Sequence, residues 1–99
     1  MAEGAIWFPG NEILIGGHWR RAESGDEIEL VNPSDGSGLC AIARSGTADV
    51  DAAVAAAGAA RDGDWGRLTA AERGRLLMQL SRAVLDRAED LARLEALDV

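Results

Sequence analysis

The chain has 99 residues and a formal net charge of −7 at pH 7, so it accommodates one domain at most and lacks the clustered positive charge that nucleic acids and anionic membranes attract. Every basic residue is an arginine, which leaves no lysine to form a Schiff base with a substrate. With one cysteine and one histidine the sequence offers no internal disulfide and no zinc cluster, and a reduced, cytoplasmic setting fits this composition best.

A β-hairpin is the first predicted element. Residues 1–12 have neither a positively charged start nor a long apolar run, so we expect no signal peptide there and no membrane span in the sequence. Residues 13–15 form a short apolar run rich in isoleucine. Gly16 and Gly17 accept the positive φ angles of a tight turn, and residues 18–20 are predicted to return as the second strand.

A second hairpin is predicted between residues 27 and 43. Residues 27–31 alternate polar and apolar side chains, as a half-buried strand does. Pro33 restricts the preceding residue to an extended conformation and ends this strand, and Asp35-Gly36 supplies the turn. Residues 39–43 return, with Cys40 on the face opposite to Leu39.

The second half of the chain predicts helices. Thr47 is a candidate N-cap, and Thr69 with Glu72 forms a capping box at the start of a second helix. A third helical stretch is predicted from about residue 88 to residue 97. The predicted apolar stripes are Val50, Ala53, Val54 and Ala57 on the first helix and Leu76, Leu77, Leu80, Ala83 and Val84, expected to be buried, on the second.

These elements do not offer one another enough apolar surface. The first helix presents mostly alanine, and two short hairpins cannot cover the stripes of both long helices. For a chain of this size, the free energy gained by burying apolar area and the free energy lost with conformational entropy nearly cancel. We therefore expect a piece of a larger protein, loosely packed or self-associating when alone.

No catalytic constellation is predicted from the residues themselves. Cys40 lies mid-strand with no base nearby in sequence, so it is interpreted as a buried, unreactive thiol. His18 is interpreted as a surface residue of a hairpin strand. Neither glycine-rich turn opens a helix, as a phosphate-binding loop must. Four acids near helix ends are interpreted as ordinary solvated charges: Asp49, Asp51, Asp62 and Asp64.

Four short motifs follow one another along residues 12–98. Their residues are Ile15, Gly16, Gly17 and Trp19; Asn32, Pro33 and Gly36; Asp49, Val50, Ala53, Val54, Ala56 and Ala57; and Glu95 and Asp98. In this order the motifs resemble the N-terminal segment of the NAD(P)-dependent aldehyde dehydrogenase superfamily.

The resemblance implies an α/β, Rossmann-like fold of which this chain is the N-terminal piece. Residues 12–46 would form β-hairpins and residues 47–98 two or three helices of the coenzyme-binding domain, with the catalytic and oligomerisation domains absent. The complete enzyme would oxidise aldehydes to carboxylic acids with NAD or NADP and would be a cytoplasmic homo-oligomer. The chain alone would hold no catalytic or cofactor-binding residue and would be inactive; Cys40 does not align with the family's nucleophile.

The resemblance also implies a structural monovalent cation. The matching positions are the backbone carbonyls of Leu30 and Val31 and the carboxylate of Asp98, and oxygen ligands of this kind suit hard cations. A plain helix-end role for Asp98 stays open beside this site. The alternative to the enzyme reading is a stand-alone helical interaction module that binds a partner through its apolar faces.

Overall fold

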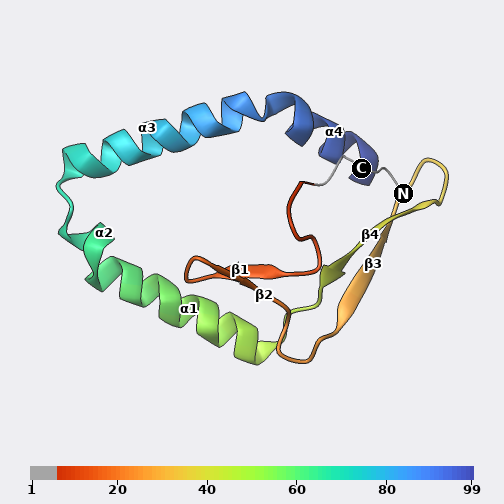
Figure 1. The fold of residues 1–99 in the computed structure, drawn as a ribbon, viewed down its shortest axis with the longest axis horizontal. Coiled ribbons are helices and arrows are strands. Elements are labelled where there is room, and N and C mark those ends of the chain that lie inside the picture. Colours follow the sequence, from red (N-terminus) through yellow and green to blue (C-terminus); the bar gives the residue numbers. More distant parts are fainter. Residues whose placement is uncertain (1–6) are drawn as a thin grey trace.

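A computed structural model describes residues 7–99; residues 1–6, half of the stretch for which no signal peptide is expected, lie outside the described part. Within residues 7–99 two antiparallel hairpins are followed by helices (Figure 1). None of the described helices is both long and apolar enough to cross a membrane. The elements are β1 (Ile13–Ile15), β2 (His18–Arg20), β3 (Glu27–Val31), β4 (Gly38–Ala43), α1 (Thr47–Asp62), α2 (Asp64–Arg67), α3 (Ala70–Asp86) and α4 (Ala88–Asp98).

The first hairpin forms as its turn glycines predict. β1 pairs with β2 so that Ile15 lies opposite His18, which leaves Gly16 and Gly17 as a two-residue loop. Their φ angles are 60° and 81°, a combination that suits the twist of the flanking strands and that side chains with a Cβ rarely adopt. The predicted strand, turn and return strand are confirmed.

The second hairpin contains a bulge at the end of β3. Leu30 pairs with Cys40, but Val31 pairs with Gly38, so the register shifts between Leu30 and Val31. In the turn, the Gly36 N–H donates to the Asn32 carbonyl at 2.7 Å, and the φ of Gly36 is 75°. The predicted stop at Pro33 and turn at Asp35-Gly36 are confirmed.

Helix α1 begins one residue earlier than its predicted cap implies. Gly46 is the N-cap and Thr47 is the first helical residue, so the prediction that Thr47 caps the helix is wrong. The Gly46 N–H donates to the Asp49 carboxylate at 3.0 Å. This contact supplies the acceptor that a capping side chain otherwise offers at a helix start.

The side of α1 that packs on the first hairpin is its alanine side. Ala52 and Ala56 are half-buried, and a Cβ placed on Gly16 would lie 3.8 Å from the Ala56 Cβ. Val50 and Val54, on the predicted apolar stripe, are exposed. Because the small residues allow the hairpin to approach closely, that stripe is left pointing away from the contact.

Helix α3 has its predicted start but no buried face. The Thr69 hydroxyl accepts the Glu72 N–H at 3.1 Å, and the Glu72 carboxylate accepts the Thr69 N–H at 2.9 Å, which confirms the capping box. No residue of α3 is buried, and Leu80 is 60% exposed. The prediction that its leucine stripe is buried is wrong for residues 7–99, because no described element covers it. The four-residue helix α2, in the connection before α3, was not predicted.

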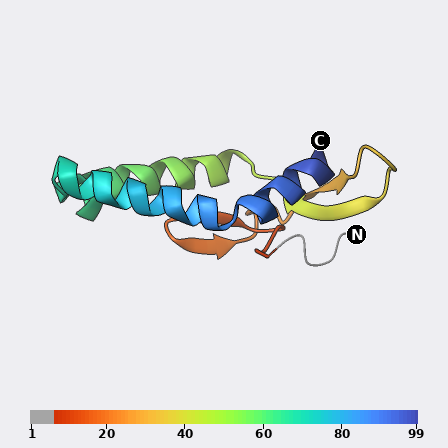
Figure 2. The same ribbon diagram turned by 90° about the horizontal axis from the view of Figure 1, so that it is seen from above.

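The molecule is flat and open. Its extents are 49 × 33 × 18 Å and its radius of gyration is 16.5 Å, against about 13 Å for a compact domain of this length. Figure 1 shows α1 and α3 on opposite sides of the β1–β2 hairpin, and Figure 2 shows the thin dimension. The buried apolar residues of the described part are Ala22 and Leu39. The core is therefore far smaller than that of an independent domain.

We expect the isolated chain to melt over a broad range, with an unfolding enthalpy below half of the ~60–80 kcal/mol usual for 100 residues. The physical reason is the missing core, which gives unfolding little cooperativity. Calorimetry combined with sedimentation measures both packing and self-association. A sharp, monomeric melt with the usual enthalpy would contradict this expectation.

Candidate functional site

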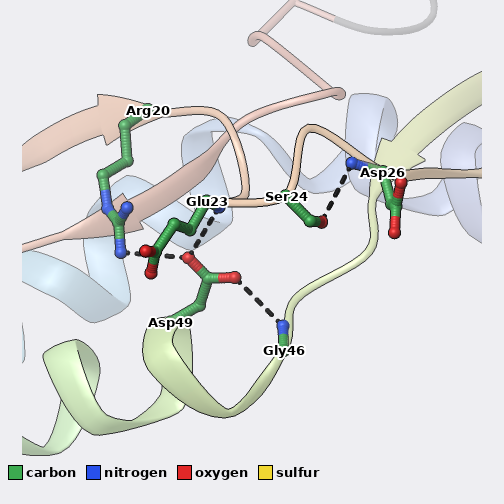
Figure 3. Close-up of polar contacts among 6 residues, drawn as sticks. All are labelled: Arg20, Glu23, Ser24, Asp26, Gly46 and Asp49. Atoms are coloured by element: carbon green, nitrogen blue, oxygen red, sulfur yellow. Dashed lines mark hydrogen bonds and ion pairs between the residues drawn. The ribbon is translucent and has the colours of Figure 1, made fainter.

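The most strongly connected polar group of the described part is the carboxylate of Asp49 (Figure 3). One oxygen, Oδ2, accepts the Gly46 N–H at 3.0 Å; the other, Oδ1, accepts the Glu23 N–H at 3.1 Å and lies 3.1 Å from Nη2 of Arg20. Asp49 is 3% exposed. The carboxylate thus joins the end of β2, the following turn and the start of α1.

The prediction that Asp49 is an ordinary solvated acid is therefore wrong, whereas Asp51, Asp62 and Asp64 are exposed as predicted. Its position three residues after a glycine N-cap was the available signal, because an acid at this place can accept the N-cap N–H. Its contacts with Arg20 and Glu23 had no such signal, since they join residues far apart in the sequence.

The surroundings of Asp49 favour its charged form. The Gly46 N–H lowers the pKa of Asp49 below its ordinary value; burial acts in the opposite direction, and the Glu23 N–H and the Arg20 guanidinium lower the pKa further. The positive end of the α1 dipole also lowers the pKa of Asp49. Both carboxylate oxygens are occupied, so the group is a structural anion rather than a general base.

A second feature is an apolar cavity of about 460 Å³ between the β3–β4 hairpin and α4. Cys40 borders it and is half-buried. Burial raises the pKa of the Cys40 thiol, and the charges of Asp98 and Glu29 raise it further. The residues around the cavity are Phe8, Gly10, Leu30, Leu39, Cys40, Ile42, Leu94, Glu95, Leu97, Asp98 and Val99.

This environment makes Cys40 a poor nucleophile, because attack requires the thiolate. His18 lies exposed at the start of β2, as predicted, and its side chain forms no hydrogen bond or ion pair within residues 7–99. Cys40 is half-buried rather than buried as interpreted, and its raised pKa agrees with the interpretation that the thiol is unreactive.

The predicted cation ligands are partly gathered at the same cavity. Leu30 and Asp98 border it, whereas Val31 lies one residue beyond, past the bulge, and is not part of its lining. Among the described residues no cluster of three acids, histidines or cysteines could hold a metal ion. A carboxylate and backbone carbonyls are oxygen ligands of the kind that hard cations take, and the monovalent-cation site stays a prediction.

An aromatic cluster links the N-terminal segment to the helices and was not predicted. Phe8 stacks on Trp19 with ring centroids 6.4 Å apart, and Trp7 meets Phe8 edge to face at 5.4 Å. The guanidinium of Arg87, between α3 and α4, lies 5.0 Å from the Trp7 ring centroid. These contacts hold the α3–α4 junction near β2.

Comparison with known proteins gives concordant matches in sequence and structure. A family model described as "Aldehyde dehydrogenase family" matches residues 19–99. Human mitochondrial 10-formyltetrahydrofolate dehydrogenase is 43% identical over 88 residues, which are 88% of this chain and 10% of that protein. The chain thus spans about a tenth of the length of the curated relatives it matches.

Two solved structures show the same arrangement. The NAD+ complex of an aldehyde dehydrogenase from Bacillus cereus superimposes with a TM-score of 0.86 and 35% identity, over 91% of this chain and 18% of that one. PnpE in complex with nicotinamide adenine dinucleotide gives 0.83 and 45%, over 90% and 18%. The two hairpins and the helices after them therefore keep their relative positions in much longer chains.

We predict that Asp49→Asn loosens the junction between the first hairpin and α1. An amide offers one acceptor oxygen instead of two, so at least one of the two backbone donors loses its partner. Amide hydrogen exchange at Glu23 or Gly46 should accelerate by about tenfold at neutral pH. Asp51→Asn, the same charge change at an exposed position of α1, is the control. If the two variants were equally protected from exchange, Asp49 would not hold this junction together.

The same carboxylate predicts a pH dependence. Since folding lowers the pKa of Asp49, its contribution is complete above the unfolded value of about 3.9 and is lost as the pH falls through the lower folded value. Wild type should therefore lose more helical circular dichroism than Asp49→Asn between neutral and strongly acidic pH. Identical acid transitions would contradict the assignment.

We also predict that the Cys40 thiol titrates above its ordinary value of about 8.5 and alkylates several-fold more slowly than free cysteine at pH 8. Asp98→Asn should lower this pKa, because it removes a negative charge that opposes the thiolate. Glu95→Gln, at the same cavity, is the matched control and should leave the titration unchanged. If the Cys40 pKa did not change in Asp98→Asn, Asp98 would not lie beside Cys40 at this cavity, and the predicted cation site requires that it does.

Proposed function

Because the chain belongs to the aldehyde dehydrogenase family, we propose that it serves as the N-terminal segment of an NAD(P)-dependent enzyme that oxidises aldehydes to carboxylic acids. The observation that carries this proposal is the agreement of both identity and three-dimensional arrangement over about nine-tenths of the chain. The overall reaction consumes an aldehyde, water and the oxidised cofactor, and yields a carboxylic acid, the reduced cofactor and a proton.

The segment's own contribution is structural. Cys40 has a raised pKa and His18 is exposed on a hairpin strand, so neither supplies a nucleophile or a base within residues 7–99. The nucleophile, the base and the groups that bind the cofactor come from the remaining polypeptide in this proposal. NAD bound to the two solved relatives supports a nicotinamide cofactor for the complete enzyme.

The stand-alone interaction module is not favoured. The family match covers residues 19–99, and the solved chains that share this arrangement include aldehyde dehydrogenases, which supports the enzyme over a module that borrowed the segment. The cytoplasmic setting and the homo-oligomer remain part of the proposal; curated relatives include both cytosolic and mitochondrial forms.

A chimera tests the proposed function. The matching segment of the Bacillus cereus aldehyde dehydrogenase is replaced by residues 19–99, and NADH formation is followed by absorbance. We expect turnover within about tenfold of the parent enzyme, because the segment has the same fold and supplies no reacting group. Cys40→Ala in the chimera should keep this activity, and the 99-residue chain alone should show none.

The parent enzyme lacking the segment is the negative control. A chimera that folds, reaches the parent's oligomeric state and still fails to oxidise any aldehyde would refute the proposal. Saturable turnover by the 99-residue chain alone would refute the proposal that the segment's own contribution is structural.

A further inference from the structure

Two apolar stripes lie open on the long helices. The α1 stripe consists of Val50, Val54 and Ala57, and the α3 stripe consists of Leu76, Leu77, Leu80 and Val84. Their valine and leucine side chains are between 42% and 66% exposed. Contiguous apolar surface of this kind marks a place where another surface packs.

The amount of open surface indicates a large partner. The accessible surface is 7230 Å², whereas a compact protein of 10.4 kDa exposes about 5,400 Å². The excess, on the order of 1,000–2,000 Å², exceeds the ~800 Å² that each partner contributes to a standard interface. It lies in the range of obligate interfaces, which are also the more apolar class.

The shape of the chain indicates what this partner is. The open arrangement of hairpins and helices is kept, with TM-scores of 0.83 and 0.86, in solved chains of which this segment covers 18%. An arrangement with almost no core of its own is therefore the one found in chains of which more than four-fifths lies outside this segment. That additional polypeptide is the partner that the solved relatives offer to the exposed stripes.

A second copy of the chain fits less well. Each copy carries a net charge of −7, so two copies repel each other. The stripes also belong to helices on opposite sides of the β1–β2 hairpin (Figure 1), and one two-fold interface covers a single patch of each copy. A larger polypeptide can cover both helices at once.

We infer that the α1 and α3 stripes form a docking surface for the remaining polypeptide of an aldehyde dehydrogenase, and that docking requires no covalent link between the two parts. The capping box of α3 and the Asp49 contacts of α1 fix the helix starts locally. The stripes are therefore presented before the partner arrives. This inference rests on the proposed function.

Fragment complementation tests the inference. The tagged 99-residue chain is co-expressed with the Bacillus cereus aldehyde dehydrogenase that lacks its matching segment, so that the remaining polypeptide meets the chain as it is made. We expect the two to purify together in equal amounts and to form NADH with an aldehyde. Self-association of the chain in place of this complex would overturn the inference.

Matched variants assign the contact to the α3 stripe. Leu80→Glu should weaken recovery of the complex at least tenfold, because it places a charge in the buried apolar contact. Met78→Glu makes the same charge change at 58% exposure, against 60% for Leu80, but on the other side of the helix, about 160° away. It should leave recovery unchanged. Equal losses, or none, would overturn the assignment.

The chimera separates the two proposals. An active chimera combined with failure of the separate parts to associate, including an insoluble remaining polypeptide, would overturn the docking inference and leave the proposed function intact. A folded but inactive chimera would remove the proposed function and with it the basis of the docking inference.

Discussion

The buried carboxylate of Asp49 is the interaction on which the arrangement of the first half of the chain depends. It is the point where the end of β2, the turn after it and the start of α1 meet. A charge of 3% exposure is costly unless it is paired and hydrogen-bonded. Here two backbone donors and one guanidinium satisfy it, so the helix can begin in one position relative to the hairpin. Removing any of these partners leaves the buried carboxylate with an incomplete set of contacts.

The rest of the arrangement depends on weaker and more exposed contacts. The aromatic cluster of Trp7, Phe8 and Trp19 with Arg87 holds the α3–α4 junction, and the apolar cavity separates α4 from the second hairpin. None of these contacts excludes water fully, because the aromatic rings are themselves 39% to 47% exposed. The segment thus has well-defined local elements whose relative positions receive little support from within residues 7–99, which is the state expected of one part of a larger core.

Local features of this fold were predictable from the sequence because their causes are local. Gly16-Gly17 determines a two-residue turn, Pro33 ends a strand, and Thr69 with Glu72 begins a helix, each through contacts within a few residues. The burial of Asp49 was missed because its partner Glu23 lies 26 residues away. The buried side of α1 was missed for a similar reason: the hydrophobic pattern indicated the valines, whereas close approach of the hairpin selects the smaller alanines. At the candidate site, Leu30 and Asp98 border the same cavity and their role as cation ligands stays a prediction, whereas the register shift beside Val31 has no marker in the sequence.

The pairing of neighbouring strands has a consequence for the rate of folding. Both sheets consist of two strands that follow each other directly along the chain, so each can close without waiting for any distant segment. Hairpins of this kind form in roughly 1–10 μs and helices of this length faster still. Joining Glu23 to Asp49 requires a much longer loop, whose closure entropy is lost before the contact compensates for it. We therefore expect hairpins and helices to form first and independently, and the junction at Asp49 to assemble them afterwards.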